Sequence, residues 1–83
     1  MRPRALKIYN KYPRQVARGR AIPAIYRAIA RLKHETEDPW VFLEEKVEVF
    51  AECMKHSDKG HLPYCATWMD DERYHDDKSE WSS

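Results

Sequence analysis

Two cysteines and two histidines stand close enough together in the sequence to suggest a metal site. Cys53, His56, His61 and Cys65 follow the pattern C-x2-H-x4-H-x3-C. Thiolate sulfurs and imidazole nitrogens in a set of four are ligands that tetrahedral zinc accepts. The spacing matches no standard zinc finger, so we expect no metal and no other cofactor. Zinc held by these four residues is the minor alternative to two buried thiols and two surface imidazoles.

A group of carboxylates near the C-terminus forms a second pattern. Asp70, Asp71, Asp76 and Asp77 surround His75. Carboxylate oxygens bind divalent cations, and a nuclease is the enzyme that such a group would suit. A solvated acidic run is the simpler interpretation, because 83 residues give no sign of a cleft. Nothing in the spacing supports either cysteine as a nucleophile paired with a histidine. We therefore predict that the protein is not an enzyme.

Arginines form the third pattern. Arg20, Arg27 and Arg31 share one face of a helix with a step of about 100° per residue, and Arg14 and Arg18 lie in the loop before it. The planar guanidinium group pairs well with phosphate oxygens. No base-reading motif accompanies these residues, so they predict weak, salt-sensitive and sequence-neutral binding of nucleic acid. The alternative is a solvated helix face.

Acidic residues form a fourth pattern, on the following helix and at the C-terminal end. They are Glu45, Glu48, Glu52, Asp76 and Asp77. Acidic segments commonly bind basic partners, so this face predicts docking on another protein, and it could also mimic nucleic acid. Reversing the charge of the arginine face should abolish DNA binding and spare such docking. Reversing Glu45, Glu48 and Glu52 should do the opposite.

The charged residues are unevenly distributed along the chain. Residues 1–33 carry ten basic residues and no acid, although the net charge of the whole chain is only +1. The later residues carry all fourteen acids and five of the basic residues. This asymmetry indicates either a polyanionic partner for the first part or attraction between the two parts.

The length of 83 residues predicts one small domain that must bury most of its large apolar side chains. No apolar run of about 18 residues is present, so we expect no membrane span. The basic N-terminal residues are not followed by the apolar core of a signal peptide. We expect a cytoplasmic protein with free thiols. The sequence does not indicate an oligomeric state.

Three helices are predicted from apolar spacing and from their end signals. The first spans about Pro3 to Tyr12 and is ended by Pro13. The second spans about Gly19 to Lys33, and Pro23 must then lie in its first turn; if the helix starts earlier, Pro23 becomes a kink. The third begins with Asp38 as N-cap and Pro39 as first residue. Its apolar stripe comprises Trp40, Leu43, Val47, Phe50, Ala51 and Met54.

The last part of the sequence predicts a clip that closes the domain. Leu62 to Tyr64 should be extended, and Ala66 to Met69 should form one helical turn. We expect Tyr64, Trp68 and Met69 to pack on the second and third helices, because exposure of large apolar side chains is unfavourable. The predicted fold is a small all-α, three-helix domain with this extended clip and short helical turn. The domain should span residues 1–77, with a flexible C-terminal tail at 78–83.

Several of these residues also resemble a known family. The motifs are Tyr12-Pro13-Arg14 with Val16 and Gly19, and Leu62-Pro63-Tyr64-Cys65-Ala66-Thr67-Trp68-Met69 followed by Arg73-Tyr74 and Asp76-Asp77. Together they resemble the C-terminal domain of phage and prophage replication proteins of the replisome-organiser or helicase-loader type. The resemblance covers about residues 8–77. The chain departs from it with Tyr64, Cys65 and Asp70, where that family commonly has His, Pro and Asn.

This resemblance implies a setting in DNA replication and no enzymatic reaction. It implies DNA, a replication protein such as a helicase, or both, as partners. Combined with the charge pattern, it predicts a non-enzymatic accessory of phage-type or mobile-element replication. In this interpretation the arginine face contacts nucleic acid and the acidic part contacts a replication protein. The alternative is a protein-only adaptor or inhibitor that uses the acidic face without binding DNA.

Overall fold

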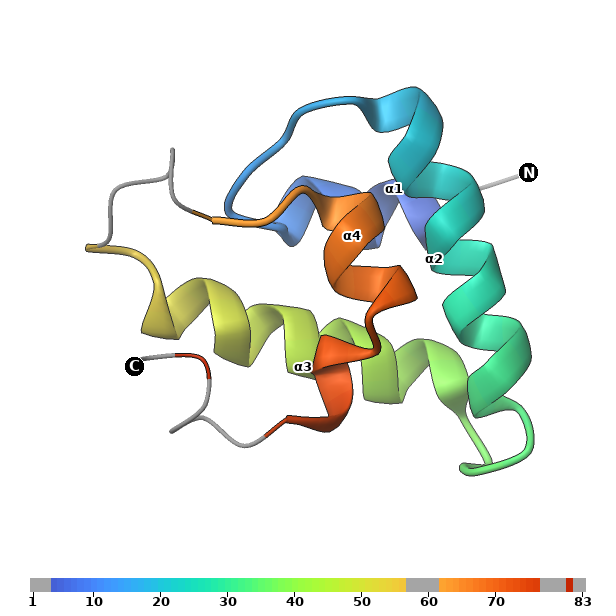
Figure 1. Ribbon diagram of the computed structural model, residues 1–83. Helices are drawn as coiled ribbons and strands as arrows, with labels where there is room; N and C mark the ends of the chain where they lie inside the picture. Colours follow the sequence, from blue (N-terminus) through green and yellow to red (C-terminus); the bar gives the residue numbers. More distant parts are fainter. Residues whose placement is uncertain (1–3, 57–61, 77–80, 82–83) are drawn as a thin grey trace.

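The computed structural model describes residues 4–56, 62–76 and 81, and all statements below concern these residues. Within them the chain forms helices and no strand. Helices α1, α2 and α3 enclose a core that α4 and the 3-10 helix η2 cover on one side (Figure 1). The predicted small all-α fold is confirmed.

Helix α1 (Arg4–Lys11) is short and one-sided. It buries Ala5, Ile8 and Tyr9, and Tyr12 follows in the core just before Pro13 ends the segment. The tyrosine hydroxyl of Tyr12 donates a 2.6 Å hydrogen bond to the carbonyl oxygen of Pro63. This bond joins the end of α1 to the extended segment that precedes α4, 51 residues later in the chain.

Helix α2 (Arg18–Leu32) starts slightly earlier than predicted, at Arg18. Pro23 therefore lies inside the helix, in its second turn, and the prediction of a first-turn proline is wrong. A proline in this position leaves the carbonyl group four residues earlier, on Gly19, without its helical hydrogen bond. The buried face of α2 comprises Ala21, Ala24, Ile25, Ala28, Ile29 and Leu32.

Helix α3 (Pro39–Cys53) begins as the sequence predicts. The Asp38 side chain accepts a 3.2 Å hydrogen bond from the backbone N–H of Val41, which satisfies one of the free donors of the first turn. Leu43, Val47 and Phe50 are buried. Trp40, predicted as a core residue, is only half-buried, because it lies near the N-terminal end of α3 rather than above its centre.

Helix α4 (Cys65–Asp70) packs more extensively on α2 than on any other element, and η2 (Arg73–His75) follows it. Trp68 and Met69 are fully buried, as the clip prediction requires. The ring of Trp68 lies 5.1 Å from Phe50 and 5.9 Å from Tyr12, measured between centroids. Tyr64 does not pack in the core: it is 38% exposed, so its predicted role as a staple is wrong.

Trp81 extends the packed part of the chain beyond the boundary predicted at residue 77. Its side chain is buried, its ring contacts Phe50 and Trp68, and its Nε1 donates a 3.0 Å hydrogen bond to the Arg73 carbonyl oxygen. For this residue the prediction of a flexible tail is wrong. A small domain has little apolar surface to bury, so the burial of one more indole ring near the C-terminus stabilises it.

Candidate nucleic-acid interface

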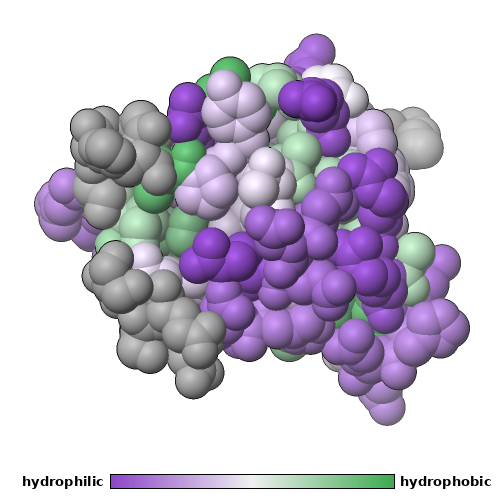
Figure 2. Space-filling view, in the orientation of Figure 1, coloured by the Kyte–Doolittle hydropathy of each residue, from purple (hydrophilic) through white to green (hydrophobic). Residues whose placement is uncertain are grey.

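The arginine face of α2 lies next to α4 and η2 instead of facing only solvent. Figure 2 shows hydrophilic residues gathered over the region where these elements meet. Each predicted arginine has to be assessed separately, because a guanidinium group engaged within the chain is less available to a phosphate. The five arginines divide into three that make contacts inside the protein and two whose side chains have no hydrogen bond or ion pair among the described residues.

Arg27 forms a two-pronged ion pair with Asp70 of α4. Its Nε lies 3.1 Å from one carboxylate oxygen and its Nη2 lies 2.8 Å from the other. The hydrogen bond from Arg27 lowers the pKa of Asp70, and the same bond raises the pKa of Arg27. Both side chains are about half-exposed, so this pair contributes little to stability. Its main effect is to neutralise Arg27 as a phosphate contact.

Arg31 holds the connection between α4 and η2. Its Nη2 donates a 2.7 Å hydrogen bond to the Met69 carbonyl oxygen, and its Nε and Nη2 both donate to the Tyr74 hydroxyl. A carboxylate oxygen of Glu72 lies 3.8 Å from the Arg31 Nε. The Tyr74 side chain is fully buried, and its burial raises the pKa of the hydroxyl. Arg31 is therefore a structural residue in this arrangement.

Arg14 is also engaged within the chain. Its Nη1 donates a 2.8 Å hydrogen bond to the Leu62 carbonyl oxygen, and its guanidinium group lies 4.6 Å from the centroid of the Tyr64 ring. These contacts tie the loop before α2 to the extended segment before α4. They also place a cation and an exposed aromatic ring next to each other at the surface.

Arg18 and Arg20 remain, in the first turn of α2. Both are exposed, and neither has an ion pair or hydrogen bond from its side chain within the described residues. Ala17 precedes them with a left-handed backbone, φ 59°, and offers no side-chain cap. The free backbone N–H groups at the start of a helix attract negatively charged groups, and the two arginines do the same. Among the five predicted arginines, the charge available to a ligand therefore lies mainly at this end of α2.

A cleft of about 500 Å³ runs from this end of α2 to α4. Its walls include Arg20, Arg27, Tyr64, Asp70 and Asp71. The two arginines and the two aspartates balance in charge, so the interior of the cleft does not attract phosphate. The favourable part is the cation without an acidic partner, Arg20, which lines this cleft together with Tyr64, on which Arg14 stacks.

The predicted acidic face is present on α3 but is partly neutralised. Glu45, Glu48 and Glu52 are exposed. Glu48 lies 2.6 Å from the Lys11 Nζ, and Glu52 lies 2.8 Å from the Lys55 Nζ, whose hydrogen bond lowers the pKa of Glu52. Asp76 pairs with Arg73 of η2 instead of joining this face, and Asp77 lies outside the described residues.

The residues considered for metal binding do not form a site in the part of the chain that is described. No three His, Cys, Asp or Glu side chains there are grouped to hold an ion. Cys65 is fully buried, and burial raises the pKa of its thiol to about 12, which disfavours a thiolate ligand. Cys53 is half-buried, and His61 lies outside the described residues. His75 lies 3.1 Å from Glu35 of the α2–α3 connection.

Sequence reasoning missed the contacts that engage Arg14, Arg27 and Arg31. The signal was available only in general form, as the attraction between a basic first part and an acidic last part. No family model matches the chain, and comparison with curated proteins and with solved structures gives no match either. None of the helices among residues 4–56, 62–76 and 81 has the length and apolar character needed to cross a membrane.

Proposed function

We propose that this protein is a non-enzymatic, cytoplasmic accessory that binds the nucleic-acid backbone through Arg18 and Arg20, with Arg14 and Tyr64 beside them. The observation that carries the proposal is the exposure of Arg18 and Arg20 without any acidic partner in the described part of the chain. The resemblance of the Ala66-Thr67-Trp68 and Arg73 motifs supplies the setting, which is phage-type or mobile-element DNA replication.

The proposed interface is small, and this size sets the expected strength of binding. Two or three arginines can neutralise two or three phosphates and release the counterions that those phosphates hold. The exposed ring of Tyr64 offers a surface on which a base can stack. An affinity carried by so few phosphates falls roughly ten- to fortyfold between about 50 and 200 mM salt. No contact to base edges is part of the proposal, so sequence preference should be weak.

Fluorescence anisotropy with labelled single- and double-stranded DNA at two salt concentrations tests the proposal. The diagnostic variant is Arg18→Gln/Arg20→Gln, because neither side chain contributes a described contact to the fold. The matched control is Lys33→Gln/Lys55→Gln, which removes the same charge from exposed positions elsewhere. We expect the first variant to lose most of the binding and the control to retain it. Equal losses in both would show that only the overall charge matters.

A variant that replaces Arg20, Arg27 and Arg31 together would be a poor test. Arg31 donates to Met69 and Tyr74, so its loss would disturb the region around η2 as well as any ligand. Weakened DNA binding could then reflect a changed fold. The structure therefore directs the mutations to the start of α2.

The second candidate function is a protein-only adaptor or inhibitor that acts through α3. Val41 and Val49 are exposed on the same helix face as the three glutamates, so this face combines acidic and apolar character. A helicase or another replication protein with a basic surface would be the partner. Glu45→Lys/Glu52→Lys should abolish that complex, while Arg18→Gln/Arg20→Gln should leave it intact. Absence of DNA binding at low salt would favour this second function.

A further inference from the structure

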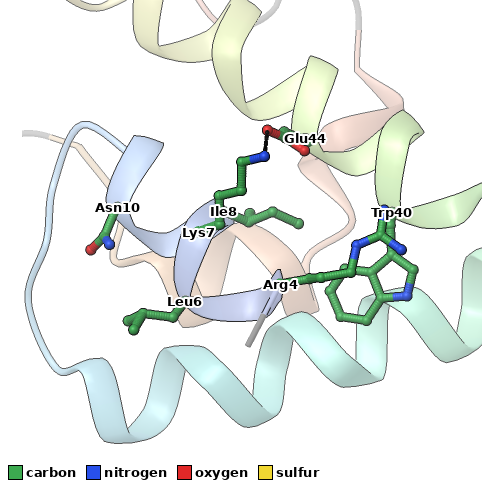
Figure 3. Close-up of a pocket in the computed structure, with 7 residues that line it drawn as sticks. All are labelled: Arg4, Leu6, Lys7, Ile8, Asn10, Trp40 and Glu44. Carbon is green, nitrogen blue, oxygen red and sulfur yellow. Dashed lines mark ion pairs between the residues drawn. The ribbon is translucent and has the colours of Figure 1, made fainter. Parts of the chain in front are cut away.

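A second cleft lies on another side of the molecule, between α1 and α3. Its volume is about 400 Å³, which is within the range of small-molecule sites in proteins. The partly buried side chains of Leu6 and Trp40 supply apolar surface, the core residue Ile8 lies behind them, and Asn10 supplies an amide. Figure 3 shows these side chains together with the charged residues of the same cleft.

Arg4 gives the cleft a cation that lies against an aromatic ring. Its guanidinium carbon lies 5.2 Å from the centroid of the Trp40 ring, and Figure 3 shows the side chain reaching across from α1. A guanidinium group stacked on an indole ring keeps its N–H groups pointing outward in its own plane. No carboxylate within the described residues pairs with Arg4, so these donors can meet a carboxylate of a ligand.

The single acid of the cleft does not cancel this charge. Glu44 lies 3.7 Å from the Lys7 Nζ and 3.5 Å from the Lys11 Nζ, so its carboxylate is shared between two lysines. The ion pair of Lys7 is drawn as a dashed line in Figure 3. Lys7 itself is largely exposed and lines the cleft. Positive charge therefore exceeds negative charge around the opening.

Trp40 is held as the wall of this cleft from two sides. Its ring forms a T-shaped pair with that of Tyr26 of α2, with the centroids 5.7 Å apart and the planes at 84°. Arg4 of α1 lies against the same Trp40 ring. A large aromatic side chain that is fixed but only half-buried offers contact area to a ligand with little further loss of conformational freedom.

We infer that this cleft binds a small organic carboxylate, in which one carboxyl group is joined to an aromatic or aliphatic body. The carboxylate would lie at Arg4, with Lys7 adding positive charge to the same cleft, and the apolar body would lie against Trp40 and Leu6. The site does not share a residue with the proposed nucleic-acid interface, so either one can fail without the other.

The test is a titration of the full chain with phenylbutyrate, followed by tryptophan fluorescence and by backbone amide NMR shifts. Trp68 and Trp81 are buried in the core, so a change of fluorescence should come from Trp40 and disappear in Trp40→Phe. Phenylbutanamide and phenylbutylamine have a similar body without the negative charge. We expect the carboxylate to bind roughly fivefold more tightly than the amide, as exposed charge pairs allow, and the amine to bind least.

Arg4→Gln/Lys7→Gln should remove the preference for the carboxylate over the amide, and Lys33→Gln/Lys55→Gln should retain it. Amide shifts should be confined to α1 and the first turns of α3, which identifies the site even if Trp40→Phe changes the fold. The inference is wrong if no saturable shift develops at millimolar ligand. It is equally wrong if the three compounds bind alike, or if the shifts lie elsewhere.

Discussion

The two halves of α2 carry arginines of the same kind in different environments. At the start of the helix, Arg18 and Arg20 are exposed and make no described side-chain contact. In the second half, Arg27 binds Asp70 and Arg31 binds Met69 and Tyr74. The difference arises because α4 and the residues after it supply acceptors for Arg27 and Arg31, and the described residues supply none for Arg18 and Arg20. A basic helix face can therefore combine a structural part and a part that is available to a ligand.

The largest expected effect comes from removing the anchor that holds α4 on α2. Trp68→Ala deletes a fully buried indole, and large-to-small changes of this kind cost about 3–5 kcal/mol of unfolding free energy. Without this anchor α4 should detach from α2. The arginines in both halves of α2 should then be exposed to solvent. Urea unfolding followed by circular dichroism measures the change.

Tyr64→Ala is the matched control for this first prediction, because Tyr64 belongs to the same predicted clip but is exposed. We expect it to cost less than about 1 kcal/mol. A similar cost for both substitutions would show that the region around α4 is not anchored mainly by Trp68.

A smaller effect should separate the arginines of the two halves. Arg31→Ala leaves the Met69 carbonyl and the buried Tyr74 side chain without their donor, which should cost about 1–2 kcal/mol. Arg18→Ala removes no described contact and should change the free energy of unfolding by less than about 0.5 kcal/mol. The same urea experiment compares the two variants. If Arg18→Ala were the more destabilising, the assignment of structural and available arginines would be reversed.

Alkaline pH should lower the free energy of unfolding because of the buried Cys65 thiol. Burial raises the pKa of this thiol from 9.0 to about 12 in the folded protein. The unfolded chain therefore loses the proton first, and stability that is present below pH 9 declines as the pH rises toward 12. For one proton the slope is at most about 1.4 kcal/mol per pH unit.

Cys65→Ala should flatten the first part of this decline, just above pH 9, when stability is measured by urea unfolding at a series of pH values. The buried tyrosines Tyr12 and Tyr74, whose pKa values are raised by burial, add to the decline at higher pH. An unchanged profile in Cys65→Ala would mean that the thiol ionises equally well in the folded state.

The smallest effect concerns the pair that neutralises Arg27. Asp70→Asn should lower stability by a few tenths of a kcal/mol, because both partners are about half-exposed. It should also raise DNA affinity roughly twofold at low salt, since Arg27 then keeps an uncompensated charge beside Arg20. Anisotropy measures the affinity, and Asp38→Asn, which retains an N-cap residue on a different surface, is the control. If the DNA affinity fell in Asp70→Asn, Arg20 and Arg27 would not act together in DNA binding.

The helices could be predicted from local sequence signals, but the tertiary contacts between them could not. Asp38 with Pro39 marks the start of α3, and the spacing of Ile25, Ile29 and Leu32 marks the buried face of α2. The exposure of Tyr64 and the burial of Trp81 depend on where segments far apart in the chain meet. A period of 3.6 residues carries no information on such contacts.

The same limit applies to the candidate site. The sequence identifies an arginine face, because Arg20, Arg27 and Arg31 share a helical phase. The helical phase does not show which other element packs against that face. The pairing of Arg27 with Asp70 depends on α4, whose position is set by Trp68 and Met69 in the core. The cleft beside Arg4 and Trp40 had no sequence signal, since its residues come from two helices without a shared motif.

The salt dependence of DNA binding tests the central claim most directly. The logarithm of the affinity is plotted against the logarithm of the salt concentration for the native protein and for Arg18→Gln/Arg20→Gln. Loss of two phosphate contacts should reduce the slope by about 1.4–1.8 relative to the native protein, with the fold unchanged by circular dichroism. An unchanged slope would contradict the account, because any DNA binding would then use other residues than the exposed arginines of α2.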